Sequence, residues 1–279
     1  MEEKCAVLAW NEPDGLAARG TLIVIPGRGE QPGLYERFGR RLGSDAYRVR
    51  VVADPTAEEA LARTQISEQL ADPGALGPRV LVGSDAGALY AVALAASGQL
   101  RGIDALVLAG LPTAAEAGAA GGSFDEELES RTSCPAHRAR LSAPGLRRGA
   151  LYEAIPAGWL EQADLARVTQ PVLGIHGSDD TLSPLARARV RYAAAPSAEL
   201  VSIVGGKHDA LNDQIHRTVA ATVVLFLERL RLGSGLPRIA VTELPGREGQ
   251  MKMGHAPELD GQELDGQEPD GQEPAHAHQ

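Results

Sequence analysis

Short apolar segments alternate along this chain with segments of helical pattern, and this alternation restricts its fold more than any other feature. The apolar segments are residues 21–25, 47–53, 80–82, 103–109, 172–176 and 200–204, and the helical ones are residues 56–70, 86–97, 184–194 and 215–232. Strands that are apolar throughout are typical of parallel sheets covered by helices on both faces. The sequence therefore predicts an α/β fold with a mostly parallel sheet flanked by helices.

One interval, residues 112–170, breaks this alternation. It contains a cluster of glycine and alanine at residues 117–122, followed by polar segments of helical pattern that end before Pro171. Because it lies between two expected strands, we expect a short helical lid inserted over the carboxyl ends of the strands. The α/β-domain is expected to span residues 5–235.

The last part of the chain, residues 236–279, differs in composition. After a possible strand at residues 238–242, a five-residue repeat begins at Glu258 and carries almost no large apolar side chains. Residues 251–279 hold seven acids and one base, so six of the chain's ten net negative charges lie there. Such a segment cannot bury enough apolar surface to offset the entropy lost on ordering. We therefore expect a disordered acidic tail.

The composition also limits the partners of this chain. A net charge of −10 argues against general binding to nucleic acid, because phosphates would not be neutralised. The apolar runs are far shorter than the roughly 20 residues that span a bilayer, and the first residues are acidic where a signal peptide is basic. Two cysteines, Cys5 and Cys134, suit a reducing compartment. We expect a cytoplasmic protein with a small-molecule substrate and without membrane insertion, and the sequence leaves its oligomeric state open.

Polar motifs follow three of the expected strands at their carboxyl ends, where open α/β sheets bind ligands. The motifs are Gly83-Ser-Asp-Ala-Gly87, Gly177-Ser-Asp-Asp180 and Gly205-Gly-Lys-His-Asp209. In the first motif the glycines permit a sharp turn that lifts the central side chain into a site. A nucleophile, an acid and a histidine in this order are typical of α/β-hydrolases. The candidate catalytic residues are therefore Asp85, Asp180 and His208.

From about residue 20 to residue 232 the chain resembles the α/β-hydrolase superfamily. Residues 26–30 and 35–38 are similar to the oxyanion loop of the monoacylglycerol lipase and lysophospholipase branch, although Pro26 stands where that branch usually has histidine. Residues 206–213, around the candidate histidine, resemble the same branch. This resemblance leaves the insertion and the tail uncovered.

The centre of the first motif departs from that branch, which has serine where this chain has Asp85. An aspartate there resembles the elbow of epoxide hydrolases and of haloalkane and haloacetate dehalogenases. A carboxylate can attack an sp³ carbon directly and form an alkyl ester. The resemblance implies that His208 then activates water, that Asp180 orients its imidazole, and that backbone N–H groups of Arg28 and Ala86 form the oxyanion hole. We expect hydrolysis of a small carbon electrophile, such as an epoxide, through Asp85.

Two other functions stay open with these residues. One is hydrolysis of a carboxylic ester or thioester of the lysophospholipase type, with water activated by His208 and no covalent serine. The other is a non-hydrolytic cyclase or binding protein of secondary metabolism. Within the site, Asp85 could serve only as a helix cap, Ser84 could be the nucleophile if the turn were shifted by one residue, and Asp179 could replace Asp180.

The insertion offers few groups for holding a substrate. Tyr152 and Trp159 are candidate substrate-binding residues, together with Ser84 beside the elbow. Epoxide hydrolases of this fold usually protonate the leaving oxygen with two lid tyrosines, and this insertion holds one. Cys134-Pro-Ala-His137 has the spacing of half a metal site but lacks a second half. We expect neither a metal nor a cofactor.

Overall fold

The computed structural model describes residues 6–114, 122–143, 146–241 and 243. The chain divides into a compact unit that ends at Arg238 and a second unit that begins at Ile239. The acidic repeats lie outside the described residues, and their disorder stays a prediction. The strand expected at residues 238–242 is not found at residues 238–241, where Ile239 and Val241 are exposed and no neighbouring strand pairs with them.

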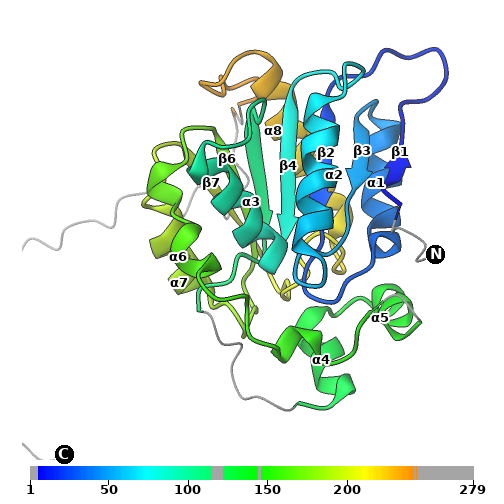
Figure 1. Ribbon diagram of the computed structural model, residues 1–279, viewed down its shortest axis with the longest axis vertical. Helices are drawn as coiled ribbons and strands as arrows, with labels where there is room; N and C mark the ends of the chain where they lie inside the picture. The colour runs from blue at the N-terminus through cyan, green and yellow to red at the C-terminus, as the bar shows by residue number, and fades with distance from the viewer. Residues whose placement is uncertain (1–5, 115–121, 144–145, 242, 244–279) are drawn as a thin grey trace, which may run out of the picture. The chain divides into compact units, whose positions relative to one another are not determined.

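Seven strands form one sheet in the order β1-β3-β2-β4-β5-β6-β7 (Figure 1). Strands β2 to β7 pair in parallel, and β1 pairs antiparallel with β3 at one edge. The strands are β1 Leu8–Trp10, β2 Thr21–Ile25, β3 Arg48–Val51, β4 Arg79–Ser84, β5 Ala105–Ala109, β6 Val172–Gly177 and β7 Ala198–Ile203. The mostly parallel sheet predicted from the sequence is thus confirmed, whereas the three-residue, partly exposed strand β1 was not among the predicted strands.

Helices cover both faces of this sheet. They are α1 Glu36–Ser44, α2 Glu59–Ala71, α3 Ala86–Ser97, α4 Phe124–Arg131, α5 Pro135–Ser142, α6 Trp159–Gln162, α7 Leu185–Tyr192 and α8 His216–Arg231, with short 3-10 turns η1 Pro32–Tyr35, η2 Ala150–Tyr152 and η3 Leu165–Arg167. Side chains of α1 and α8 share one core with one side of the strands, and those of α2, α3, α6 and α7 share the other.

Strand β2 shows how the sequence pattern produces these two cores. Leu22 and Val24 point into the core beneath α1 and α8, whereas Ile23 and Ile25 point into the core beneath α2 and α3. Successive side chains of a strand point to opposite faces, so an unbroken apolar run is what burial on both sides requires. All four side chains are fully buried.

The two halves of the interval between β5 and β6 pack in different parts of the molecule. Its first part, α4 and α5, lies beyond the carboxyl ends of the strands (Figure 1). Its later part packs on helix α3, where Trp159 of α6 stacks on Tyr90 with 4.7 Å between ring centroids. Only the first part therefore has the position expected of a lid.

In the part of the chain that the structure describes, no helix is both long and apolar enough to cross a membrane.

Candidate active site

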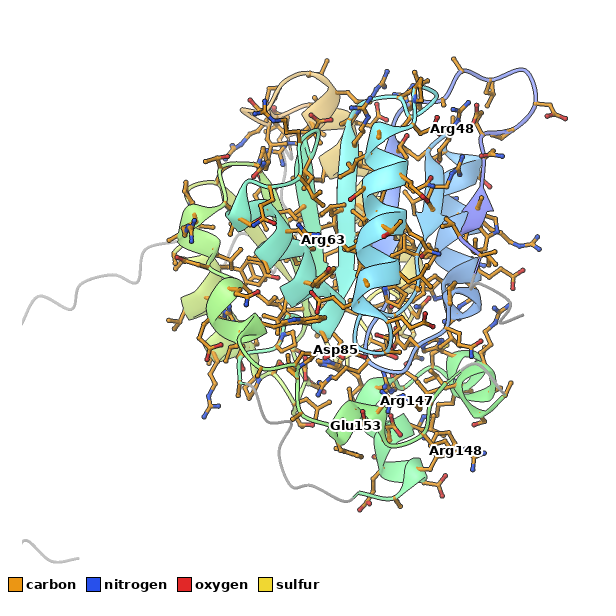
Figure 2. All side chains as sticks on the ribbon, viewed as in Figure 1. Arg48, Arg63, Asp85, Arg147, Arg148 and Glu153 are labelled. Atoms are coloured by element: carbon orange, nitrogen blue, oxygen red, sulfur yellow. The ribbon has the colours of Figure 1, made fainter. Side chains whose placement is uncertain are left out.

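A sharp turn between β4 and α3 places Asp85 at the carboxyl edge of the sheet (Figure 2). Its φ of 47° and ψ of −125° are strained values for a residue with a side chain. A Cβ at Gly83 would lie 2.4 Å from the Ala88 Cα, and one at Gly87 would lie 2.4 Å from the Ile25 carbonyl oxygen. The turn is therefore centred on Asp85, and Ser84 is the buried last residue of β4.

The loops after β6 and β7 bring an acid and a histidine to this turn. His208 Nδ1 lies 2.8 Å from Asp180 Oδ2, and His208 Nε2 lies 3.1 Å from Asp85 Oδ1. All three residues are buried. Asp179 is exposed and accepts a hydrogen bond from Ser178 Oγ. Asp180 is thus the acid that pairs with the histidine, and the three candidate catalytic residues come together.

The side chain of Arg28 enters the same site, which the sequence did not predict. Arg28 Nε donates to Asp85 Oδ2 and Nη2 donates to Asp85 Oδ1, both at 2.8 Å, and the backbone N–H of Arg28 also donates to Oδ2 at 3.0 Å. Nη1 donates to the carbonyl oxygen of Glu153 in the insertion at 2.7 Å. Both oxygens of Asp85 are therefore held by one arginine. The N–H expected to stabilise an oxyanion is bonded to Asp85 itself.

The charges of the site stabilise one another. Burial alone would raise the pKa of Asp85, but Arg28 and then His208 outweigh it and hold that pKa well below its usual range. Burial alone would lower the pKa of His208, but Asp180 and Asp85 outweigh it and raise that pKa to about 10. At neutral pH the site thus holds a carboxylate and an imidazolium side by side.

Comparison with known proteins relates the chain to others through structure. No protein-family model matches it, and no curated protein matches it. A soluble variant of monoglyceride lipase from Saccharomyces cerevisiae superposes with a TM-score of 0.64 at 17% identity, over 80% of this chain and 90% of that one. The monoacylglycerol lipase of Paleococcus ferrophilus gives 0.62 at 17% identity, over 80% and 97%. A putative non-heme bromoperoxidase BpoC from Mycobacterium tuberculosis gives 0.61 at 14% identity, over 84% and 97%.

The chain has the α/β-hydrolase fold. The order of the strands, the elbow after β4, and the acid and histidine after β6 and β7 agree with the resemblance seen in the sequence. At such low identity these likenesses establish the fold of the chain and leave its reaction to be argued from its own residues.

A second buried ion cluster joins the insertion to two of the loops that form the site. Arg131, at the end of α4, contacts Glu30 Oε1 at 2.9 Å, Glu127 Oε1 at 3.1 Å, Asp209 Oδ1 at 3.6 Å and the carbonyl oxygen of Arg28 at 2.9 Å. Its side chain is fully buried. The loop of the candidate histidine closes on the same helix end, where the backbone N–H of Asp209 donates to the carbonyl oxygen of Arg131 at 2.8 Å. Arg131 thus links the insertion to the loop of Arg28 and to the loop of His208.

The carboxyl groups around Arg131 differ in their surroundings and in their partners. Burial, and then the charge of Asp209, raise the pKa of Glu30 to about 8. Glu127 accepts hydrogen bonds from the backbone N–H groups of Gly149 and Leu151, and so ties α4 to the segment that follows α5. No local sign in the sequence marks this cluster, because Glu and Arg four residues apart on a helix are also typical of a solvated face.

The remaining predicted residues lie at varying distances from this centre. Ala86 is the buried first residue of α3, directly after Asp85. Tyr152 is half-buried in η2, whereas Trp159 is buried against α3. Cys134 precedes α5 and receives a hydrogen bond from Arg37, and His137 lies 3.2 Å from Asp209. The roles expected for Tyr152 and Trp159 in binding stay predictions.

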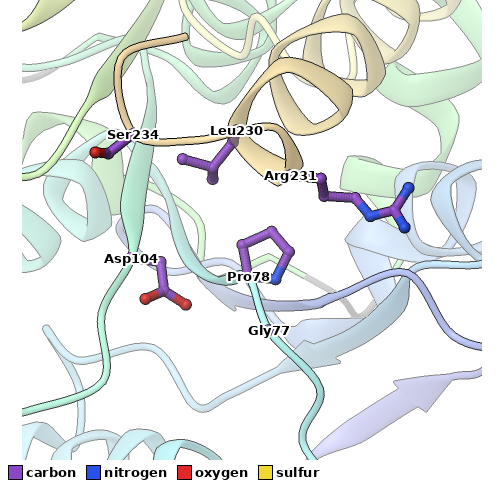
Figure 3. A pocket seen from close by; sticks show the side chains of 6 residues that line it. All are labelled: Gly77, Pro78, Asp104, Leu230, Arg231 and Ser234. Atoms are coloured by element: carbon purple, nitrogen blue, oxygen red, sulfur yellow. The ribbon is translucent and has the colours of Figure 1, made fainter.

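Two cavities can be compared with the position of Asp85. One of about 500 Å³ is lined by Pro78, Asp104 and Arg231 (Figure 3), and it lies at the amino ends of β4 and β5, away from the candidate catalytic residues. The other, of about 460 Å³, borders Gly29 and is lined in part by Arg147 of the insertion. The second cavity adjoins the loop that carries Arg28, at the edge of the sheet where the site lies.

Proposed function

We propose that this protein hydrolyses a carboxylic ester or thioester at the site formed by Asp85, His208 and Asp180. The observation that carries the proposal is the position of His208 between two carboxylates, 3.1 Å from Asp85 and 2.8 Å from Asp180. An ionised carboxylate beside an imidazolium supplies a base and an acid at one reacting centre. The structures of similar fold that are named as monoglyceride lipase, monoacylglycerol lipase and esterase support ester chemistry for this site.

The protonation of the pair assigns the roles. Water attacks the acyl carbon as one of its protons passes to Asp85. The bond from the acyl carbon to the leaving oxygen or sulfur breaks as His208 Nε2 donates a proton to that atom. The products are a carboxylic acid and an alcohol or thiol, and the proton on Asp85 then returns to His208. Asp180 holds the imidazole through Nδ1, as the acid of a triad does.

The oxyanion of the tetrahedral intermediate needs donors that Asp85 uses in the ligand-free state. The backbone N–H groups of Arg28 and Ala86 are the donors proposed for it. The first of these donates to Asp85 Oδ2 at 3.0 Å. Substrate binding must therefore displace the Asp85 carboxylate from the Arg28 N–H.

A second candidate is attack by Asp85 itself on a carbon electrophile such as an epoxide. It is favoured by the elbow geometry, which directs one carboxylate oxygen to the Arg28 N–H and the other to His208. Arg28 lowers the pKa of Asp85 and so weakens this carboxylate both as a nucleophile and as a base, which means that the pKa favours neither candidate over the other. The two candidates differ in the atom that first bonds to the substrate.

Labelled water separates these two candidates. We expect a single turnover of an ethyl ester in ¹⁸O-water, with protein in excess, to place the label in the product acid and none in the peptide that contains Asp85. Mass spectrometry of both products measures this, with protein incubated in labelled water without ester as the control. Label in the Asp85 carboxylate above that control would overturn direct attack by water and favour the covalent route.

The pH dependence of kcat/KM tests the acid role of His208. Because the pKa of His208 is raised to about 10, it carries its proton at lower pH and loses it as the pH rises through that value. We expect kcat/KM to stay level from about pH 7 to 9 and to fall as the pH approaches the pKa of His208. Rates with an Asp85→Asn variant serve as the blank for spontaneous ester hydrolysis. A rise of kcat/KM through pH 7 would instead indicate a neutral histidine acting as a base.

A further inference from the structure

The side chain of Arg28 blocks the access of a substrate to Asp85. It binds both carboxylate oxygens, and the side chains of the two residues are 4% and 0% exposed. A substrate that is to meet Asp85 and His208 must first separate this pair. Which substrates can separate the pair depends on whether they supply a new partner for the Arg28 guanidinium.

A guanidinium cannot be neutralised by losing a proton at accessible pH. If the guanidinium is left unpaired in a buried site, the free energy that its desolvation costs is no longer offset by an ion pair. A neutral ester supplies no charge to replace Asp85. A ligand carboxylate offers the same two-oxygen fork that Arg28 now binds, and planar bidentate pairing is the arrangement arginine favours.

The charge of the site also remains balanced in this exchange. In the ligand-free state Arg28 and His208 balance Asp85 and Asp180, all four in contact and buried. When a ligand carboxylate takes Arg28, Asp85 keeps His208 as its partner and its oxygens become free to accept a proton from water. The Arg28 N–H that now donates to Asp85 becomes available to the oxyanion.

We infer that the substrate carries its own carboxylate, bound by Arg28, close to the bond that is cleaved. The inference rests on the proposed ester hydrolysis and names its substrate class, a half-ester or thioester of a short dicarboxylic acid. The chain between the two carbonyl carbons must be short, because Arg28 and His208 contact the same carboxylate of Asp85. Arg28 is then a specificity-determining residue that pairs with Asp85 in the structure and with the substrate carboxylate during the reaction.

Two esters of nearly equal shape test the inference by kinetics. Ethyl hydrogen succinate carries a carboxylate where ethyl levulinate carries a methyl ketone. We expect kcat/KM to be at least tenfold higher for the half-ester, and we expect Arg28→Met to remove that preference. Arg147→Met is the matched control, because Arg147 lines the neighbouring cavity, pairs with Glu153 and is half-exposed. Equal rates for both esters, or loss of the preference in the Arg147 variant alone, would overturn the inference.

Binding measured without turnover separates failure of the inference from failure of the proposed function. Levulinate and levulinamide, a carboxylate and its neutral counterpart, are titrated by calorimetry into the wild type, Asp85→Asn and Arg28→Met. We expect levulinate alone to bind, at least tenfold more tightly to Asp85→Asn, which releases Arg28, and not to Arg28→Met. This pattern without ester hydrolysis would reject the proposed reaction and retain the ligand class. Hydrolysis without a carboxylate preference, or equal binding of the amide, would reject the ligand class.

Discussion

Replacing His208 by alanine is expected to lower kcat/KM for ester hydrolysis by about 10²- to 10⁴-fold, the range that a positioned acid or base contributes. The imidazole contacts both Asp85 and Asp180, so its loss removes the proton donor to the leaving group and the link between the two acids. Steady-state release of the alcohol from an ethyl ester measures the effect.

His216, half-buried at the start of α8, provides the matched control for this substitution. Its Nδ1 lies 3.1 Å from the carbonyl oxygen of Asp213, away from the proposed site. We expect His216→Ala to keep kcat/KM within twofold. Because His208→Ala leaves two buried carboxylates facing one another, His208→Gln is measured beside it, with circular dichroism and thermal unfolding as checks of the fold. Retained activity in a folded His208 variant would contradict the proposed mechanism.

Replacing Arg131 by methionine is expected to lower the free energy of unfolding by about 3–5 kcal/mol, as measured by chemical denaturation. Arg131 is fully buried and holds Glu30, Glu127 and Asp209. Its removal leaves these carboxylates without their shared counter-charge, whereas the methionine side chain fills much of the same volume. Few other single substitutions in the described part of the chain would disturb as many buried charges.

The pH dependence of that loss follows from the carboxyl groups. A buried carboxyl whose pKa is raised, as for Glu30 at about 8, favours the folded state while protonated and loses that contribution as the pH rises through its pKa. Without Arg131 the Glu30 carboxylate loses the counter-charge that favours its ionised form, so the deficit should be larger at pH 8 than at pH 5.5. Arg140→Met, which breaks the half-exposed pair of Arg140 with Glu36, is the control and should cost less than about 1 kcal/mol. Equal losses in both variants would show that the Arg131 cluster does not stabilise the fold.

Local patterns in the sequence predicted most of the architecture. The strands were visible because burial on both faces demands uninterrupted apolar residues, as in β2, and the elbow was visible because Gly83 and Gly87 are required where the backbone approaches Ala88 and Ile25. The exceptions are elements whose burial depends on a distant partner. Edge strand β1 lies in a short apolar run that was not predicted as a strand and that stays partly exposed beside its one partner β3, and α6 was assigned to the lid although Trp159 packs on α3.

The sequence by itself determined the α/β-fold and predicted Asp85, Asp180 and His208 as the candidate site, because each follows a strand in a motif with its own signature, although it left Ser84 and Asp179 open. The tertiary structure alone decided what surrounds them. Arg28 and Asp85 are 57 positions apart, and Arg131 lies 101 positions from Glu30. Such ion pairs form only where loops that follow different strands pack together and exclude water. The spacing of residues along the chain does not indicate which of these loops will be in contact. The sequence thus predicted the aspartate of the elbow, but it did not predict that the side chain of Arg28 pairs with it.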